Sequence, residues 1–508
     1  MSERGRRRSE RRTRSGSATN QPAWRSLVYQ RPAYPLLSED ELEQIHRSAL
    51  AILAEIGMTV LSADARRLYA GHGFDVDPDS ERVRFDSNGI ESLIAQAPSS
   101  FTLHARDPAK QIHIGEDNLV FCAVGGPAYI MDLDRGRRDG TYAEQCDFLR
   151  LVQSLNILHQ EGGGGFEALD LPAASRHLDL YYAQCTLLDK NWVPWTIGRD
   201  QAIDAIEMGA ISLGVKPDDL VRKPMFYAII NTNSPLQLDI PMADGLIAMA
   251  EYGQALAITP FTLAGAMAPV TLAGALAQQH AEAMAGIALT QIVRPGNPVI
   301  YGGFTSNVDM RTGSPAFGTP EYVQAAQASG QLARRIGVPF RSSNVTAANA
   351  PDAQAAYESC MSLWGAMSGH ANVVKHAAGW LHGGLTASLE KLIIDAEMLQ
   401  MMAATLTPFT VDEDTIALDA VRDVGPAGHY FGTPHTMERF ETAFYAPLVS
   451  NWDNYETWQE KGSLSTEQRA NQVWKQLLRD YQQPDLDPAV DEALRDYVAR
   501  RKREITAG

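Results

Sequence analysis

Cysteine is scarce in this sequence, and the residues present do not form a closely spaced pair. No CxxC motif occurs in 508 residues, and the four cysteines lie far apart at Cys122, Cys146, Cys185 and Cys360. Disulfide frameworks and structural zinc sites both require sets of cysteines, at short spacings in the case of zinc. The sequence therefore predicts neither.

Long apolar runs and a surplus of basic residues are also missing. No stretch approaches the roughly 18 apolar residues of a membrane-spanning helix, and no apolar segment of a secretion signal follows the arginines near the N-terminus. The sequence has 44 Lys and Arg against 61 Asp and Glu, for a formal net charge of -17. We expect a cytoplasmic protein that spans no membrane and does not bind nucleic acid.

The composition that is present, 45% hydrophobic and 21% charged residues, is typical of a globular protein with a large core. Residues 1–20 contain seven arginines and almost no apolar side chain, which predicts a disordered tail. Residues 21–115 predict an N-terminal α+β cap region. Its first helix should begin at the N-cap Ser38 and end at Gly57.

Between residues 116 and 405 a strand followed by a helix recurs eight times. The apolar strand candidates open near Leu119, Ile157, Trp192, Met225, Ala257, Pro298, Val338 and Asn372. Eight such units predict an α/β fold of the (β/α)8 TIM barrel type. An open doubly wound sheet would show fewer strands and a glycine-rich phosphate turn after the first one. Residues 406–508 lose this pattern and predict a C-terminal helical extension.

Functional side chains of such a barrel lie at the carboxyl ends of the strands and in the loops that follow. Read at these positions, the sequence offers aromatic, amide and basic residues and few acids. The candidates are Glu161, Trp195, Asn231, Asn233, Tyr301, Phe304, Arg341, Asn344, Lys375, His376 and Trp380.

Metal-dependent barrel hydrolases cluster His and carboxylate ligands, often as HxH after an early strand. No HxH occurs here, and the strand-end histidines His159, His376 and His382 are scattered. We therefore predict no directly bound metal. The glycine run in EGGGGF (161–166) lacks the GxGxxG and GxxxxGK[ST] spacings of phosphate loops, and more simply allows a sharp turn or a close approach to a ligand.

Trp195, Tyr301, Phe304 and Trp380 are all predicted at strand ends, where the barrel faces its ligand. Several aromatic rings around one cavity bind quaternary ammonium groups through cation–π attraction, because such groups have no N–H to donate. The alternative, that each ring simply fills the barrel mouth as core, stays open for any single residue.

Four longer segments are specific enough to compare with known families. They are FCAVGGPAYIMDLDRGRRDGTYAE (121–144), APDAQAAYES (350–359), EKLIIDAEML (390–399) and DVGPAGHYFGTPHT (423–436). They resemble the trimethylamine methyltransferase family, the MttB-like superfamily, and the likeness extends from about residue 30 onward. The resemblance implies a (β/α)8 barrel that moves a methyl group from a methylated amine to the cobalt of a separate corrinoid protein.

The founding members of that family carry pyrrolysine, whereas this sequence uses only the standard twenty residues. It is similar in this respect to the non-pyrrolysine, glycine betaine methyltransferase-like branch, which demethylates glycine betaine, proline betaine or carnitine. The resemblance thus implies cobalamin carried by a partner protein and a small quaternary amine as substrate. HAAG (376–379) is similar to the end of the cobalt-binding DxHxxG motif, but Val374 occupies the aspartate position, so this chain is not the cobalamin carrier. We also expect a homo-oligomer.

Under this resemblance, His376 and Glu161 are the residues we assign to catalysis. A protonated His376 is the first candidate to hold a betaine carboxylate, before Lys375, Arg341 and the amides of Asn231, Asn233 and Asn344. Glu161 would face the ammonium or act as a structural acid. His429 and Tyr430 would close over the substrate or the corrinoid, or form a structural turn.

Other functions stay open at this stage. One is a trimethylamine-type methyltransferase without pyrrolysine, and another is a barrel hydrolase or lyase with a tightly bound metal. A third is a betaine-binding barrel that has lost its chemistry. A quaternary ammonium leaves as a neutral amine and needs no general acid, which modestly favours the quaternary amine.

Overall fold

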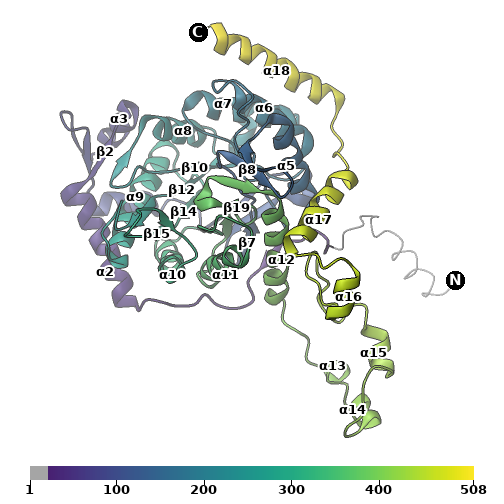
Figure 1. Cartoon of the computed structure of the whole chain (residues 1–508). Coiled ribbons are helices and arrows are strands. Elements are labelled where there is room, and N and C mark those ends of the chain that lie inside the picture. The colour runs from purple at the N-terminus through teal and green to yellow at the C-terminus, as the bar shows by residue number, and fades with distance from the viewer. Residues whose placement is uncertain (1–20, 508) are drawn as a thin grey trace, which may run out of the picture.

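The computed structural model describes residues 21–507, and its body is a parallel sheet with helices outside it (Figure 1). The predicted disordered tail over residues 1–20 lies outside the described residues. The main sheet has the order β1-β7-β18-β17-β14-β12-β10. The parallel strands are β7 (Asn118–Phe121), β10 (Tyr227–Ile230), β12 (Ala255–Ile258), β14 (Val299–Gly302), β17 (Phe340–Ser343) and β18 (Val373–Lys375). The short β1 (Leu27–Val28) pairs antiparallel to β7.

The second and third expected strands are reduced to single parallel bridges. Cys122 pairs with Gln160, and Gln160 pairs with Asn191. Glycines at 162–165 and Pro194 explain this, because glycine weakens a strand and proline cannot donate to its ladder. Within residues 21–507 no backbone pairing joins the Asn191 segment to β10. The α/β class is therefore confirmed, whereas a closed barrel is not observed.

Eight helices follow the eight strand segments and cover the sheet, as expected from the repeat. They are α5 (Tyr142–Ser154), α6 (Arg176–Leu187), α7 (Arg199–Leu213), α8 (Ile240–Glu251), α9 (Leu272–Val293), α10 (Pro320–Arg335), α11 (Ala353–Ser368) and α12 (Leu389–Leu406). Local signals start them: Thr141 and Glu144 form a capping box at α5, and Ser388 caps α12. No helix of the described residues is long and apolar enough to cross a membrane.

Residues 21–115 contain the expected α+β elements. They are α2 (Glu39–Ala51), the π-helical turn η2 (Ile52–Ile56), β2 (Met58–Val60), α3 (Ala63–Gly71), β3 (Asp75–Asp77), β4 (Arg82–Arg84), α4 (Ser87–Ile94), β5 (Ser100–Leu103), η3 (Pro108–Lys110) and β6 (Ile112–Gly115). The first helix begins at the capping box of Ser38 and Glu41, and the chain turns at Gly57 with φ 77°. Both predicted ends are confirmed.

Side chains on the two faces of the main strands belong to different apolar clusters. Cys122, Tyr227 and Ile300 share an inner cluster with Phe101 and Ile112 of the β5–β6 hairpin. Their neighbours in sequence face the helices instead, because successive strand residues point to opposite faces. The hairpin therefore packs with the inner face of the sheet.

Short strands surround the carboxyl ends of the main sheet. They are β8 (Tyr129–Asp132), β9 (Gly136–Asp139), β11 (Gln237–Leu238), β13 (Phe261–Ala264), β15 (Phe304–Val308), β16 (Pro315–Ala316), β19 (Trp380–Leu381) and β20 (Thr386–Ser388), with the short helix η5 (His382–Gly384). The short helix η4 (Pro217–Arg222) lies instead between α7 and the start of β10. β13 pairs with β15, and β19, β20, β8 and β9 form a second small sheet. Of these strands, β13, β15 and β19 each contribute one aromatic residue to a cavity at this end of the sheet.

The C-terminal residues are helical, as predicted. The helices are α13 (Glu413–Ile416), α14 (Leu418–Val424), α15 (Pro434–Arg439), α16 (Tyr455–Glu460), α17 (Thr466–Asp480) and α18 (Pro488–Ala507). α17 packs on α12 and α5, and α18 packs on α6 and α7. In Figure 1, α13, α14 and α15 project away from the body. The division of the chain into a cap region (21–115), a barrel (116–405) and a C-terminal extension (406–508) stays a prediction.

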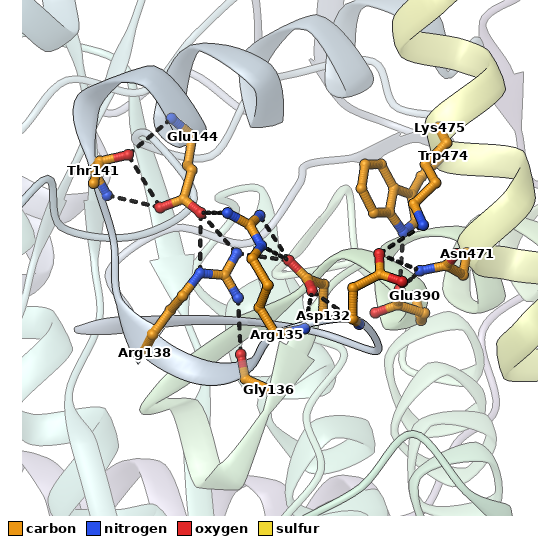
Figure 2. A network of polar contacts seen from close by, with 11 residues as sticks. Asp132, Arg135, Gly136, Arg138, Thr141, Glu144, Glu390, Asn471, Trp474 and Lys475 are labelled. Atoms are coloured by element: carbon orange, nitrogen blue, oxygen red, sulfur yellow. Dashed lines mark hydrogen bonds and ion pairs between the residues drawn. The ribbon is translucent and has the colours of Figure 1, made fainter.

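A polar network attaches α17 to the body (Figure 2). The buried carboxylate of Glu390 accepts hydrogen bonds from Trp474 Nε1 at 2.8 Å and Asn471 Nδ2 at 2.9 Å. Lys475 pairs with Asp134 at 2.6 Å in the turn between β8 and β9. Close by in Figure 2, Arg135 and Arg138 bridge Asp132 and Glu144 and hold that turn against the start of α5. Within the motif at residues 121–144, Asp134 thus contacts the extension directly, and the neighbouring charges fix the turn that carries it.

Candidate functional site

A cavity of about 640 Å³ lies at the carboxyl ends of the main strands. Its lining comes from the loops after nearly every strand, as expected for the functional end of such a sheet. Its size and mixed lining are those of a small-molecule site. The lining includes Gly162, Glu167, Trp195, Asn231, Asn233, Phe261, Phe304, Arg341, Lys375, His376 and Trp380.

Four aromatic side chains line this cavity: Trp195, Phe261, Phe304 and Trp380. The Phe304 ring centroid lies 5.0 Å from that of Phe261 and 6.3 Å from that of Trp380. Trp195 Nε1 donates to the Gly163 carbonyl oxygen at 3.0 Å, and Trp380 Nε1 donates to that of Thr346 at 3.1 Å. Because both indole N–H groups are already bonded, the two rings are fixed and can offer a ligand their π faces.

Two buried cations also line the cavity. Arg341 in β17 and Lys375 in β18 are each 2% exposed. Lys375 Nζ donates to the Gly162 carbonyl oxygen and lies 3.6 Å from Cys122 Sγ. The Arg341 guanidinium lies 5.2 Å from the Phe304 ring centroid. Burial lowers the pKa of both side chains, and the neighbouring Cys122 and Glu161 partly counteract this at Lys375.

Neither cation has a carboxylate partner in the described part of the chain, and Arg341 also leaves donor atoms unbonded. Its Nε and Nη1 atoms are buried and have no hydrogen-bond partner there. The one acid in the cavity lining, Glu167, pairs instead with Arg176 at 2.8 Å. An unpaired buried donor costs about 1–3 kcal/mol, more when charged. The site is therefore arranged for an anionic group that the protein itself does not provide.

His376 lines the cavity, as predicted, but its surroundings disfavour the cationic form that the sequence suggested for it. Burial, followed by the charges of Lys375 and Arg341, lowers the pKa of His376 well below 6.5. The ring lies 4.5 Å from the Trp380 centroid, and Nδ1 has no partner among the described residues. The backbone adopts the left-handed region at φ 54°, which is strained for a residue other than glycine. The surroundings that the protein itself provides therefore favour the neutral imidazole.

A pH measurement tests this protonation state. Below pH 6.5 the unfolded chain binds a proton at His376 that the folded chain does not bind, so the stability of the folded state decreases as pH falls. Between pH 7.5 and pH 5.5, wild-type protein should lose about 1 kcal/mol more unfolding free energy than His376→Asn. Denaturant unfolding at both pH values measures this difference. Equal losses in the two proteins would mean that His376 is protonated in the folded state.

Glu161 is buried beside the cavity rather than lining it. Its carboxylate accepts hydrogen bonds from the backbone N–H of Gly163 at 2.8 Å and of Gly164 at 2.6 Å, and from Gln184 Nε2 at 2.6 Å. Gly163, Gly164 and Gly165 have φ values between 76° and 109°, which only glycine adopts without strain. These contacts match the structural alternative for Glu161, which holds the glycine loop against the cavity.

The other predicted residues divide into two groups. Asn231 and Asn233 line the cavity, although the Asn233 side chain is engaged with Asp239 at the start of α8. Asn344 is buried, does not line the cavity, and donates to the Ala377 carbonyl oxygen at 2.8 Å. Tyr301 was expected at the barrel mouth, and this expectation is wrong. Its ring lies on the helix side of β14, with its hydroxyl 3.1 Å from Gln279 and 3.2 Å from His280.

His429 and Tyr430 lie far along the projecting part of the extension. They follow α14, are exposed, and do not line the cavity. The expectation that they close over a bound ligand is therefore not met in this structure. The reason is α12, which carries the chain away from the cavity before the projecting helices begin (Figure 1).

Phe261 is the aromatic ring of the lining that the sequence reasoning missed. The apolar stretch at 257–265 reads as one strand, which places Phe261 inside it. The structure divides it into β12 and β13, with the break at Pro260. Proline interrupts a central strand because it cannot donate to the ladder, so Pro260 was the available signal. Across residues 21–507, no group of three or more His, Cys, Asp or Glu side chains could hold a metal ion.

Comparison with known proteins gives consistent results. The family model described as trimethylamine methyltransferase (MTTB) matches residues 3–506. The glycine betaine methyltransferase of Desulfitobacterium hafniense strain Y51 is 38% identical over 475 residues, covering 93% of this chain and 98% of that protein. The trimethylamine methyltransferase MttB of Methanosarcina barkeri is 25% identical over 467 residues, covering 89% and 92% of the two chains. The crystal structure of the Methanosarcina barkeri monomethylamine methyltransferase (MtmB) covers 90% of this chain and 94% of its own, at 11% identity and a TM-score of 0.47.

Proposed function

This chain belongs to the trimethylamine methyltransferase family and is a methyltransferase, and from this premise we propose its substrates. The methyl donor is a quaternary amine that carries a carboxylate, of the glycine betaine, proline betaine or carnitine kind. The acceptor is Co(I) of a corrinoid held by a separate protein. The relative that is 38% identical over nearly its full length supports the donor, since it is named as a glycine betaine methyltransferase.

The observation that carries the proposal is the unpaired Arg341 next to an aromatic wall. A betaine joins a carboxylate to a quaternary ammonium through a short linker. Arg341 lines the cavity and offers its guanidinium to the carboxylate in a site where no protein acid competes for it. Lys375 adds a second positive charge in the same cavity.

The ammonium end would lie against the rings of Trp195, Phe261, Phe304 and Trp380. Each desolvated cation–π contact contributes about 2 kcal/mol. Phe304 is central to this arrangement, because it contacts two other cavity rings and the Arg341 guanidinium. A neutral His376 also suits the end of the cavity that holds the cation, because a charged imidazolium there would repel the ammonium.

The reaction requires little acid–base chemistry from the protein. The C–N bond breaks with its electron pair staying on nitrogen, so the product is a neutral tertiary amine and no proton has to be donated. The protein has to remove water from the ammonium and direct one N-methyl group outward. Contact with the aromatic rings removes water from the ammonium, and the contact between Arg341 and the carboxylate fixes the direction of the N-methyl group. Co(I) acts as the nucleophile that accepts the methyl group.

The cavity fits the amine but not the corrinoid. A volume of about 640 Å³ suits a small molecule and is too small to enclose a corrin ring with its side chains. The corrinoid therefore has to approach the cavity from outside on its own protein.

We further propose that residues 116–405 act as a closed (β/α)8 barrel, with residues 21–115 as a cap and 406–508 as an extension.

A panel of amines incubated with Co(I) cobalamin tests this function. We expect glycine betaine, proline betaine or carnitine to yield methylcobalamin, followed by its absorbance, together with one equivalent of the demethylated amine by mass spectrometry. Trimethylamine should give none. The cognate corrinoid protein should raise the rate.

Three outcomes would contradict the proposal. Methyl transfer from trimethylamine alone would support a trimethylamine-type enzyme without pyrrolysine. Tight betaine binding without transfer, even with the cognate corrinoid protein, would support a non-catalytic binding barrel. A stoichiometric metal found by elemental analysis, with no transfer, would support a hydrolase or lyase.

A further inference from the structure

Residues 407–444, called the arm here, carry a concentrated apolar surface outside the cavity. Ten of the twenty-five exposed large hydrophobic side chains of residues 21–507 lie in this short segment. Phe409, Phe431 and Phe444 are 86%, 85% and 86% exposed. Scattered single hydrophobic residues are ordinary on a protein surface, but a contiguous set marks an interaction site. In Figure 1 the arm contains α13, α14 and α15 and projects from the body.

The arm has a defined fold even though its aromatic side chains are exposed. Asp412 accepts a hydrogen bond from the Thr415 N–H at 2.7 Å and caps α13. Thr433 caps α15, and Arg439 of α15 pairs with Asp414 of α13 at 2.5 Å. These local bonds shape the arm without burying its apolar surface, so that surface is available to a partner.

The end of the arm is anchored to α12. The Glu397 carboxylate accepts hydrogen bonds from the Tyr445 hydroxyl at 2.8 Å and from the N–H groups of Leu448 and Val449 at 2.6 Å each. Its start follows directly from Leu406, the last residue of α12. Both attachments therefore hold the arm on one helix of the body.

The direction of α12 separates the arm from the cavity. The helix begins at Leu389, shortly after the cavity residues Trp380 and Gly384, and has 18 residues. At 1.5 Å per residue its far end lies about 27 Å away. The apolar surface of the arm is therefore separate from the cavity mouth, where the acceptor protein docks if the proposed function is right.

A second apolar surface lies on α11, the helix next to α12. Tyr357 is 60% exposed and Trp364 is 54% exposed, and the exposed Cys360 lies between them. Positions three and four apart share one side of a helix, so these three residues form a stripe, called the α11 face here. None of the three is charged.

We propose that the arm of one copy of this chain packs on the α11 face of a second copy, and that the two copies do so reciprocally. The arm contains seven acidic residues against two arginines, so two arms would repel each other, whereas the α11 face carries no charge. A reciprocal contact of this kind closes as a twofold dimer.

The exposed area is sufficient for a stable dimer. Four arm phenylalanines, Phe409, Phe431, Phe440 and Phe444, are 60–86% exposed. They present roughly 500 Å² in total if each aromatic side chain has about 150–200 Å² to bury. The rings of Tyr357 and Trp364 on the α11 face present roughly 200 Å² on the same basis. Two such contacts, counted on both partners, cover roughly 1,400 Å², and stable interfaces bury about 1,200–2,000 Å².

The oligomeric state of full-length protein tests the proposal. Size-exclusion chromatography with light scattering at micromolar concentration should give at least twice the mass of one chain for wild type. The double variant Phe431→Ser/Phe444→Ser should give the mass of one chain, as should Trp364→Ser. Met310→Ser, at a side chain that is 71% exposed outside both surfaces, is the matched control and should keep the wild-type mass.

A cross-link tests the contact itself. Phe431→Cys should form a disulfide-linked dimer with Cys360 of the other copy under mild oxidation, and Cys360→Ser should abolish it. A monomeric wild type, or an unchanged mass in the double arm variant, would overturn the proposal. So would an arm variant that keeps its mass but no longer transfers methyl groups to the corrinoid protein. Dissociation by the arm variant but not by Trp364→Ser would overturn the α11 face as the receiving surface.

Discussion

Arg341→Met is expected to lower the affinity for glycine betaine by about 100- to 1,000-fold. Removing one partner of a buried, hydrogen-bonded charge pair costs about 2–5 kcal/mol, and tenfold in affinity corresponds to about 1.4 kcal/mol. The loss should be confined to ligands with a carboxylate. Calorimetric titration with glycine betaine and with tetramethylammonium, which has the charged nitrogen alone, measures both affinities in both proteins.

The stability of this variant provides an independent check. Arg341 is 2% exposed, with two donor atoms lacking partners among the described residues, so an apolar side chain of similar length should be tolerated or favoured. We expect an unchanged or higher Tm for Arg341→Met. Arg341→Lys keeps the charge but loses the planar pair of donors and should fall between wild type and the methionine variant. A similar loss of tetramethylammonium binding would show that Arg341 shapes the whole cavity rather than binding a carboxylate.

Phe304→Leu is expected to weaken glycine betaine binding by about 10- to 30-fold. The substitution keeps most of the volume but removes a π face, and a desolvated cation–π contact contributes about 2 kcal/mol. Stability should fall by less than about 1.5 kcal/mol. Titration of the variant with glycine betaine gives the change in affinity.

The carbon isostere of glycine betaine separates charge from shape. In 3,3-dimethylbutyrate a neutral carbon replaces the ammonium nitrogen and the carboxylate remains, so Phe304→Leu should change its affinity by no more than about threefold. Phe317→Leu is the matched control, because Phe317 contacts Phe304 and Trp380 with ring centroids 5.9 Å and 6.0 Å away and does not line the cavity. Equal losses for both ligands in Phe304→Leu would leave Phe304 with a packing role only.

Much of the fold could be predicted because its signals are local. Helix starts at Ser38 and Thr141 need only a capping residue and an acid three positions later. The strand and helix order needs only apolar runs and their period. Even the place of the cavity followed from this order, since loops after parallel strands gather at one end of the sheet.

Other features depend on groups that are distant in sequence. The Tyr301 ring faces the helices because of the pairing and pleat of β14, and a local motif cannot specify which face of a strand is inside. Burial, and then the charges of Lys375 and of Arg341 from another strand, lower the pKa of His376 and favour its neutral form. Glu161 holds a glycine loop rather than a ligand because Gln184 and the loop N–H groups surround it.

The sequence by itself determined the α/β class, the order of the elements and the aromatic and basic character of the strand ends, since each depends on neighbouring residues alone. Only the tertiary structure decided which of those side chains share a cavity, which of them are charged there, and that the arm lies away from the cavity. Side-chain direction, burial and electrostatic coupling are set by atoms from distant parts of the chain, and they exist only once those parts are packed together.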